Sequence, residues 1–177
     1  MSAEVSEIWQ ARWLPASAFA LTPNERDWLL NTASLTARLK ALPGDFKLVL
    51  RLEQSLFLPE ALAKHWACAE GVVREVILKV ADVPCVYAQS FMPISTVQAL
   101  TPLAQLGEKP LGEYIFQQES LERGDIELAE FANGFRLPEL GAQAAMFGRR
   151  SLFTLNQHQL LVQELFLPGL FELCRGT

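Results

Sequence analysis

Hydrophobic and polar residues alternate in several short stretches of the chain, and this alternation is typical of half-buried β-strands. The stretches are residues 46–52, 72–80, 86–92, 151–155 and 160–167. The turn-forming sequence Asp82-Val83-Pro84 separates the second stretch from the third, and Asn156-Gln157-His158-Gln159 separates the fourth from the fifth. Strands joined by such short turns run antiparallel, because a parallel connection needs a dozen residues or more.

Capping residues predict several short helices between and before these strands. Thr22 stands before Pro23 and three residues before Glu25, which is a capping box that opens a helix. Ser34 is expected to start a second helix that ends at Pro43-Gly44. Two further helices, each opened by a proline, are expected at residues 101–107 and 110–116.

Residues 119–147 carry the weakest pattern in the chain. An amphipathic turn or two of helix is expected over residues 125–132, followed by the helix breakers Gly134, Pro138 and Gly141. Together, the elements predict one α+β domain over residues 1–177, with an antiparallel sheet covered on one face by helices.

Composition excludes several classes of protein. Half of the 177 residues are hydrophobic, which excludes a disordered chain and provides one substantial core. Lysine and arginine number 15 against 20 aspartate and glutamate, a formal charge of −5, so a nucleic-acid partner is not expected. No apolar stretch approaches 18 residues, and the acidic start does not read as a signal peptide, so we expect no membrane span.

The cysteines and histidines predict a reduced chain without a metal centre. Cys68, Cys85 and Cys174 are odd in number and form no Cys-x-x-Cys pair, which is typical of a cytoplasmic protein. His65 and His158 stand alone, without the spacing of metal ligands. The sequence therefore favours a cytoplasmic domain that binds no metal.

Two charged residues stand in otherwise apolar rows. Arg74 shares one face of its predicted strand with four aliphatic residues, and Glu164 shares a face with Leu160, Val162 and Phe166. Burial of an ion costs several kcal/mol unless it is paired or solvated. Arg74 and Glu164 therefore either form a buried salt bridge with each other or line a ligand pocket. In a pocket, the guanidinium can bind a carboxylate of the ligand, and the carboxylate can accept a hydrogen bond from a ligand hydroxyl or act as a base.

Six blocks of sequence carry a more specific indication. They are Asp27-Trp28-Leu29-Leu30, Arg74-Glu75-Val76-Ile77-Leu78, Pro93-Ile94-Ser95-Thr96, the segment 106–116 with the pattern LGxxPLGxYxF, Phe147-Gly148-Arg149-Arg150-Ser151 and Glu164-Leu165-Phe166-Leu167-Pro168. In this order and over nearly the whole chain, they resemble the chorismate pyruvate-lyase family. Members of that family convert chorismate to 4-hydroxybenzoate and pyruvate for ubiquinone biosynthesis.

The resemblance implies a fold, a site and an activity. It implies one α+β domain in which two helical flaps cover an enclosed site, and a lyase without metal or organic cofactor. By position, Arg74 would bind the ring carboxylate and Glu164 would lie near the phenolic hydroxyl, as the two catalytic residues. Leu111 in the flap motif and Leu35 would complete the substrate-binding set, although characterised relatives have methionine where this chain has Leu35.

Some features of the reaction stay open at this level. Glu164 is either a base or a hydroxyl anchor, and Arg149, Arg150 and Lys109 are the candidate cations for the enolpyruvyl carboxylate. Arg74 and Glu164 would hold the product at both ends. Slow release of the product is therefore expected to limit turnover, and its tight binding to cause product inhibition. A monomer is expected. The alternative is a small-molecule sensor without catalysis, since the same kind of fold resembles the effector-binding domains of some bacterial transcription regulators.

Overall fold

An antiparallel sheet forms the centre of the molecule. The computed structural model describes residues 3–175, with side chains from residue 7 onward. The strands are β1 (Leu14–Pro15), β2 (Phe46–Phe57), β3 (Glu70–Val80), β4 (Val83–Pro93), β5 (Glu122–Arg123), β6 (Glu127–Phe131), β7 (Arg136–Leu137), β8 (Gly141–Ala142), β9 (Met146–Leu155) and β10 (His158–Phe166). The main sheet has the order β1-β6-β9-β10-β4-β3-β2, with β5 paired to β9, and β7 and β8 form a separate hairpin.

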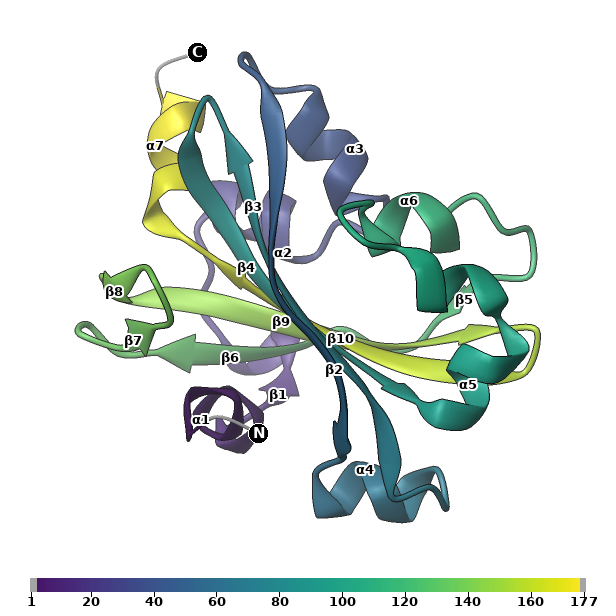
Figure 1. Cartoon of the computed structure of the whole chain (residues 1–177). Helices are drawn as coiled ribbons and strands as arrows, with labels where there is room; N and C mark the ends of the chain where they lie inside the picture. The colour runs from purple at the N-terminus through teal and green to yellow at the C-terminus, as the bar shows by residue number, and fades with distance from the viewer. Residues whose placement is uncertain (1–2, 176–177) are drawn as a thin grey trace.

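Helices surround this sheet (Figure 1). They are α1 (Ala3–Gln10), α2 (Pro23–Leu29), α3 (Leu35–Lys40), α4 (Glu60–His65), α5 (Ile94–Ala99), α6 (Leu111–Ile115) and α7 (Pro168–Arg175), with 3-10 turns η1 (Ala16–Ala18) and η2 (Thr101–Gln105). The predicted α+β fold with an antiparallel sheet is confirmed.

The predicted helix starts are found where the capping residues stand. Thr22 accepts a hydrogen bond from the backbone of Glu25, whose carboxylate accepts one from the backbone N–H of Thr22, so the capping box is complete. Ser34 likewise accepts from the backbone N–H of Ala37 at the start of α3. Both helices are short, because local caps fix their first turns and tertiary contacts decide how far they continue.

The two predicted turns are tighter than expected. Ala81 and Asp82 form the turn between β3 and β4, and Asn156 and Gln157 form the turn between β9 and β10. All four residues have positive φ angles between 48° and 66°. This is the backbone conformation of two-residue hairpin loops, whose twist matches that of the strands. Val83, which was expected in the first turn, therefore already pairs with β3.

The helix expected at residues 125–132 is wrong. Residues Glu127–Phe131 form strand β6, which pairs with β9 from Glu127 opposite Arg150 to Phe131 opposite Met146. The edge of β9 offers backbone hydrogen-bond partners that a short, weakly amphipathic helix would leave unused. Tertiary pairing thus overrides the local preference.

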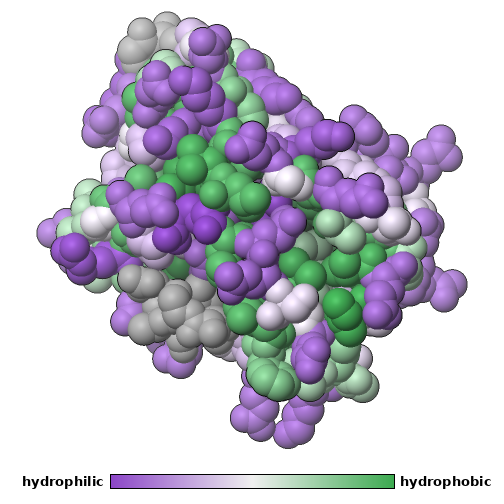
Figure 2. Space-filling view, in the orientation of Figure 1, coloured by the Kyte–Doolittle hydropathy of each residue, from purple (hydrophilic) through white to green (hydrophobic). Residues whose placement is uncertain are grey.

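The faces of the sheet are covered differently. On one face, apolar residues of α2, α3 and α7 pack on β3, β4 and β10, while α5, η2 and α6 pack on β9 and β10. On the other face, Ile8 of α1 and Leu62 of α4 join smaller clusters. Figure 2 shows a mostly hydrophilic exterior with apolar patches near the middle of this view. The functional site lies under the first, thicker helical layer.

Candidate functional site

A cavity of about 50 Å³ lies between the sheet and the helices α3 and α6. We call these two helices the flap helices, because both line the cavity and they contact each other. They lie side by side in Figure 1. Their contact includes an ion pair between Lys40 of α3 and Glu113 of α6. Most of the lining is aliphatic or aromatic, and its polar groups are Thr36, Arg74, Ser90, Arg123, Arg149 and Glu164.

The four residues expected to bind substrate all line this one cavity. Arg74 lies on β3 and Glu164 on β10, while Leu35 and Leu111 are the first residues of the two flap helices. The sequence separates them by up to 129 positions, and the antiparallel sheet with its helical cover brings them together. Their convergence is a geometric finding of the fold, independent of any assigned role.

Arg74 is held in place by two partners. Its side chain is 2% exposed, forms an ion pair with Glu53 on β2, and donates from Nη2 to the backbone oxygen of Lys109 at 3.0 Å. Glu53 stands directly opposite Arg74 in the strand register. These contacts fix the plane of the guanidinium, and a guanidinium has further N–H donors to offer to a planar carboxylate.

Glu164 is paired with Arg149 on the neighbouring strand. Arg149 Nε donates to Glu164 Oε2 at 2.6 Å, and the two residues are register partners of β9 and β10. Arg149 is 2% exposed and its Nη1 also donates to the backbone oxygen of Asn31 at 2.8 Å, in the loop before α3. Arg149 therefore links the carboxylate of the cavity to the segment that carries a flap helix.

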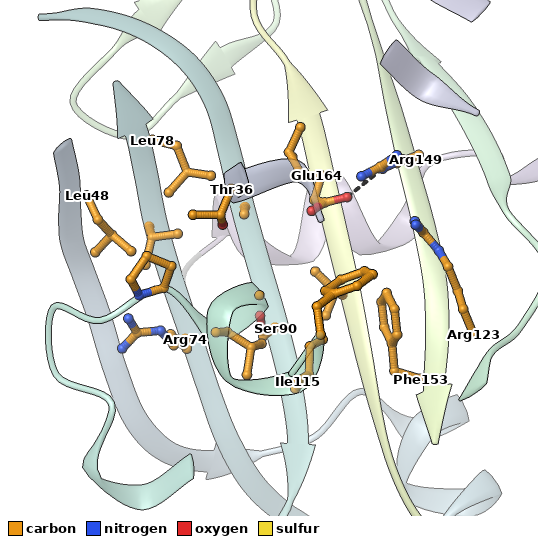
Figure 3. Close-up of a pocket in the computed structure, with 18 residues that line it drawn as sticks. Thr36, Leu48, Arg74, Leu78, Ser90, Ile115, Arg123, Arg149, Phe153 and Glu164 are labelled. Carbon is orange, nitrogen blue, oxygen red and sulfur yellow. Dashed lines mark hydrogen bonds and ion pairs between the residues drawn. The ribbon is translucent and has the colours of Figure 1, made fainter. Parts of the chain in front are cut away.

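Arg74 and Glu164 do not form a salt bridge with each other, so that reading of the sequence is wrong. Strand β4 lies between their two strands, and its residues Ala88 and Ser90 both line the cavity there. Ala88 is the register partner of Glu164, and Ser90 is the partner of Arg74. These two small side chains leave space above the sheet, with a cation at one end and a carboxylate at the other (Figure 3).

Two of the three cations expected near a second carboxylate lie elsewhere. Arg150 points away from the cavity, pairs with Glu127 at 2.6 Å and stacks near Trp9 and Trp13. Adjacent residues of a strand face opposite sides of the sheet, so Arg149 and Arg150 cannot both reach the cavity. Lys109 contributes its backbone oxygen to Arg74, while its exposed side chain lines a groove outside the flap helices.

Arg123 is a cavity residue that sequence reasoning missed. It lies on β5, which pairs with β9, and its guanidinium is directed toward the Arg149–Glu164 pair (Figure 3). Burial lowers the pKa of Arg123 to about 10, with a further lowering by the positive charge of Arg149. It remains a cation at neutral pH. The pairing of β5 with β9 brings it here, and the sequence pattern predicted no strand at these residues.

Two observations concern sites of other kinds. Within the described residues, no group of three or more His, Cys, Asp and Glu side chains is arranged to hold a metal ion. In the same part of the chain, no helix has the length and apolar character needed to cross a bilayer.

The fold and the site define a class: a small α+β domain with an internal cavity suited to a small anionic molecule.

Comparison with known proteins gives the family. A family model described as "Chorismate lyase" matches residues 8–175. A "Probable chorismate pyruvate-lyase" of Pseudoalteromonas translucida is 40% identical over 169 residues, which cover 91% of this chain and 94% of that protein. A protein of the same name from Pseudomonas putida is 37% identical over 179 residues, 97% of this chain and 96% of its own length. The chain therefore belongs to the chorismate lyase family.

Solved structures share the fold at low sequence identity. The effector domain of PhnF from Mycobacterium smegmatis matches with a TM-score of 0.55 and 13% identity over 78% of this chain and 90% of that one. The ligand-binding domain of a putative GntR-family transcriptional regulator from Bordetella bronchiseptica matches with 0.53 and 16%, over 71% and 84%. At these identities the likeness concerns the fold alone.

Proposed function

We propose that this chain is a lyase that cleaves chorismate into 4-hydroxybenzoate and pyruvate. One observation carries the proposal: Leu35, Arg74, Leu111 and Glu164 converge on one cavity in a chain of the chorismate lyase family. The cavity presents a fixed guanidinium and a fixed carboxylate at its two ends. A benzoate with a hydroxyl opposite its carboxylate carries complementary groups at its own two ends.

Arg74 binds the ring carboxylate in this proposal, with help from the flap helices. Leu35 and Leu111 each begin a helix, and the first backbone N–H groups of a helix have no partner within it. Thr36 of α3 lies against Gly112 of α6, so the two helix starts approach each other. The N–H groups of Ala37 and Glu113 already have acceptors, so in this proposal the first two N–H groups of each helix are the ones that face the ligand, near the backbone that Arg74 contacts just before α6.

The reaction requires no oxidant or reductant, because the atoms of chorismate are all found in its two products. The ether bond at ring carbon C3 breaks, the C4 hydrogen is lost, and the enolpyruvyl methylene gains a hydrogen to become the methyl group of pyruvate. The ring becomes aromatic, which drives the reaction forward. The protein then has to hold a reactive conformer and stabilise the changing charge, and we propose that it does so without a cofactor.

The test uses purified protein, chorismate and EDTA. Formation of 4-hydroxybenzoate is followed by absorbance and pyruvate by a coupled assay, against a blank without protein. Equal amounts of both products at an enzyme-dependent rate are expected. Arg74→Met should lose most of this activity together with affinity for 4-hydroxybenzoate. Absence of product, with thermal stabilisation by 4-hydroxybenzoate, would instead identify a small-molecule sensor on this fold.

Glu164 holds the C4 hydroxyl, and Glu164→Gln decides whether it also takes a proton. Glutamine keeps a hydrogen-bonding group of similar size but is not a base. A fall in kcat of about 10²- to 10⁴-fold with little change in KM would identify a general base. A smaller loss, shared with 4-hydroxybenzoate affinity, would identify an anchor.

The setting of the enzyme is also part of the proposal. In the family, 4-hydroxybenzoate enters ubiquinone biosynthesis, and we extend this role to the chain. None of its three cysteines forms a disulfide bond within the described residues, which supports a reducing compartment such as the cytoplasm. A monomer is expected, and the molar mass measured by light scattering after size exclusion tests it.

A further inference from the structure

Three guanidinium groups line the cavity, and they differ in how their charge is balanced. Arg74 is paired with Glu53 and Arg149 with Glu164. Arg123 donates from Nε to Ser151 Oγ at 3.0 Å and from Nη1 to the backbone oxygen of Asn31 at 3.5 Å, and both acceptors are neutral. Among the side chains that the structure describes, no carboxylate forms an ion pair with Arg123.

An unbalanced cation in a partly dehydrated cavity is costly. Burial penalises the charged form, and the repulsion from the neighbouring cation Arg149 outweighs the attraction of Glu164, whose carboxylate is already paired with Arg149. The guanidinium is also fixed, since its Cζ lies 5.1 Å from the centre of the Phe153 ring in addition to its two hydrogen bonds. A positive charge held in place without an anion of its own points to an anionic group supplied by the ligand.

The geometry of chorismate places its second carboxylate near Arg123. The ring carboxylate and the hydroxyl lie at opposite ends of the ring, and the enolpyruvyl ether is attached to the carbon next to the hydroxyl. With the first carboxylate on Arg74 and the hydroxyl on Glu164, the ether begins at the Glu164 end. Arg123 and Arg149 are both at this end (Figure 3), and only Arg149 is already neutralised.

We propose that Arg123 binds the enolpyruvyl carboxylate of the substrate, which makes it the residue that distinguishes substrate from product. This inference rests on the proposed lyase activity. After cleavage, that carboxylate belongs to pyruvate. The other product, 4-hydroxybenzoate, has no group that contacts Arg123. Arg149 instead positions Glu164 and the loop before α3.

Two ligands that are not turned over test this role by titration calorimetry. 4-Hydroxybenzoate carries one carboxylate, and 3-(carboxymethoxy)-4-hydroxybenzoate adds a second one through an ether at the ring position used in chorismate. Arg123→Gln keeps N–H donors for Ser151 and Asn31 but removes the charge. It should weaken the dicarboxylate by about 10- to 100-fold, the value of a charge-assisted hydrogen bond. The affinity for 4-hydroxybenzoate should change by less than about threefold, or about 0.7 kcal/mol, because this ligand lacks the second carboxylate.

Controls separate charge, folding and activity. Arg123→Lys keeps the charge and should recover part of the affinity for the dicarboxylate. Arg136→Met removes an exposed charge on β7 and should leave the affinity for both ligands unchanged. If Arg123→Gln unfolds, Arg123→Met is measured in its place. An equal loss for both ligands, or no loss for the dicarboxylate, overturns the proposal.

The failure of the proposed function is distinguishable from the failure of this inference. Wild-type protein that binds both ligands but leaves chorismate intact contradicts the lyase, while the two-ligand comparison still decides the role of Arg123. In an active enzyme, Arg123→Gln should lower kcat/KM for chorismate by the same factor as the dicarboxylate affinity.

Discussion

Arg149 and Glu164 stand opposite each other on β9 and β10, and Arg149 Nε lies 2.6 Å from Glu164 Oε2. The same guanidinium donates to backbone oxygens of Trp28, Leu29 and Asn31. One side chain thus holds both the carboxylate of the cavity and the end of α2 with the loop that leads to the first flap helix. Catalytic geometry and local folding are coupled through it.

Replacement of Arg149 by methionine should therefore damage stability as well as activity. It leaves Glu164 partly buried without its cation and three carbonyl groups without a donor. We expect the free energy of unfolding to fall by about 3 kcal/mol. This value is at the lower end of the range for breaking a buried ion pair, because the side chain of Glu164 is 16% exposed. Urea denaturation measures this loss.

A double-mutant cycle with Glu164→Gln is the control for that substitution. In the double variant, most of the loss should be absent, because glutamine leaves no carboxylate that lacks its cation at this position. Additive effects of the two substitutions would contradict the coupling.

Leu35→Met should be nearly neutral. Leu35 is 5% exposed and begins α3, and leucine and methionine have similar volumes, so the exchange costs less than about 1.5 kcal/mol. If the ligand contacts the backbone at this position, its affinity depends little on the side chain. Calorimetry with 4-hydroxybenzoate should show a change in Kd of less than about threefold. A larger gain in affinity would mean that the thioether itself contacts the ligand.

Gly112→Val should loosen the closure of the flap helices. A Cβ at Gly112 would lie 3.2 Å from Thr36 Oγ1 and 3.8 Å from Ser34 Oγ, so the branched side chain must push α3 and α6 apart. If product release limits turnover, wild-type enzyme shows a burst of product equal to the enzyme concentration in rapid mixing. The variant should release 4-hydroxybenzoate faster and show a smaller burst.

Gly112→Ala provides a graded control for this experiment. Its single methyl group makes a tight contact with Thr36 without further bulk, so its effect should lie between those of wild type and valine. Unchanged dissociation of product in the valine variant would show that the two helices do not gate release.

Cys85 should make the protein less stable in alkaline solution. Its side chain is fully buried, and burial raises the pKa of the thiol from 9.0 to about 11. Above pH 9 the unfolded chain loses this proton while the folded chain keeps it, so stability present below pH 9 is lost as the pH rises toward 11. Between pH 8 and 10 this amounts to about 1 kcal/mol.

Urea denaturation at the two pH values measures the effect, with Cys85→Ala as the control. Between the two pH values, the free energy of unfolding of the variant should fall less than that of the wild type. The difference is the contribution of the Cys85 thiol. An identical decrease in both proteins would assign it to other groups. Tyr87, whose burial also raises its pKa, adds to the loss only above its ordinary range near pH 10.

Elements that depend on contacts between near neighbours in the chain could be predicted from the sequence. The strands from β2 to β4 and the pair β9 and β10 follow from alternation, and α2 and α3 begin at Thr22 and Ser34 because capping is a contact over three residues. The alternation also placed Arg74 and Glu164 on cavity-facing rows, since side-chain direction in a strand has a period of two.

The ion-pair partners of the cavity residues depend on the order of the strands in the folded sheet. Arg74 takes Glu53 and Glu164 takes Arg149 because the strand order sets β4 between β3 and β10, and no local pattern encodes that order. Residues 127–131 become a strand because β9 offers an edge, and the same edge recruits β5 and with it Arg123. Pairing between distant segments depends on hydrogen bonds and buried area that exist only after the sheet has assembled, so Arg123 could not be found from the sequence.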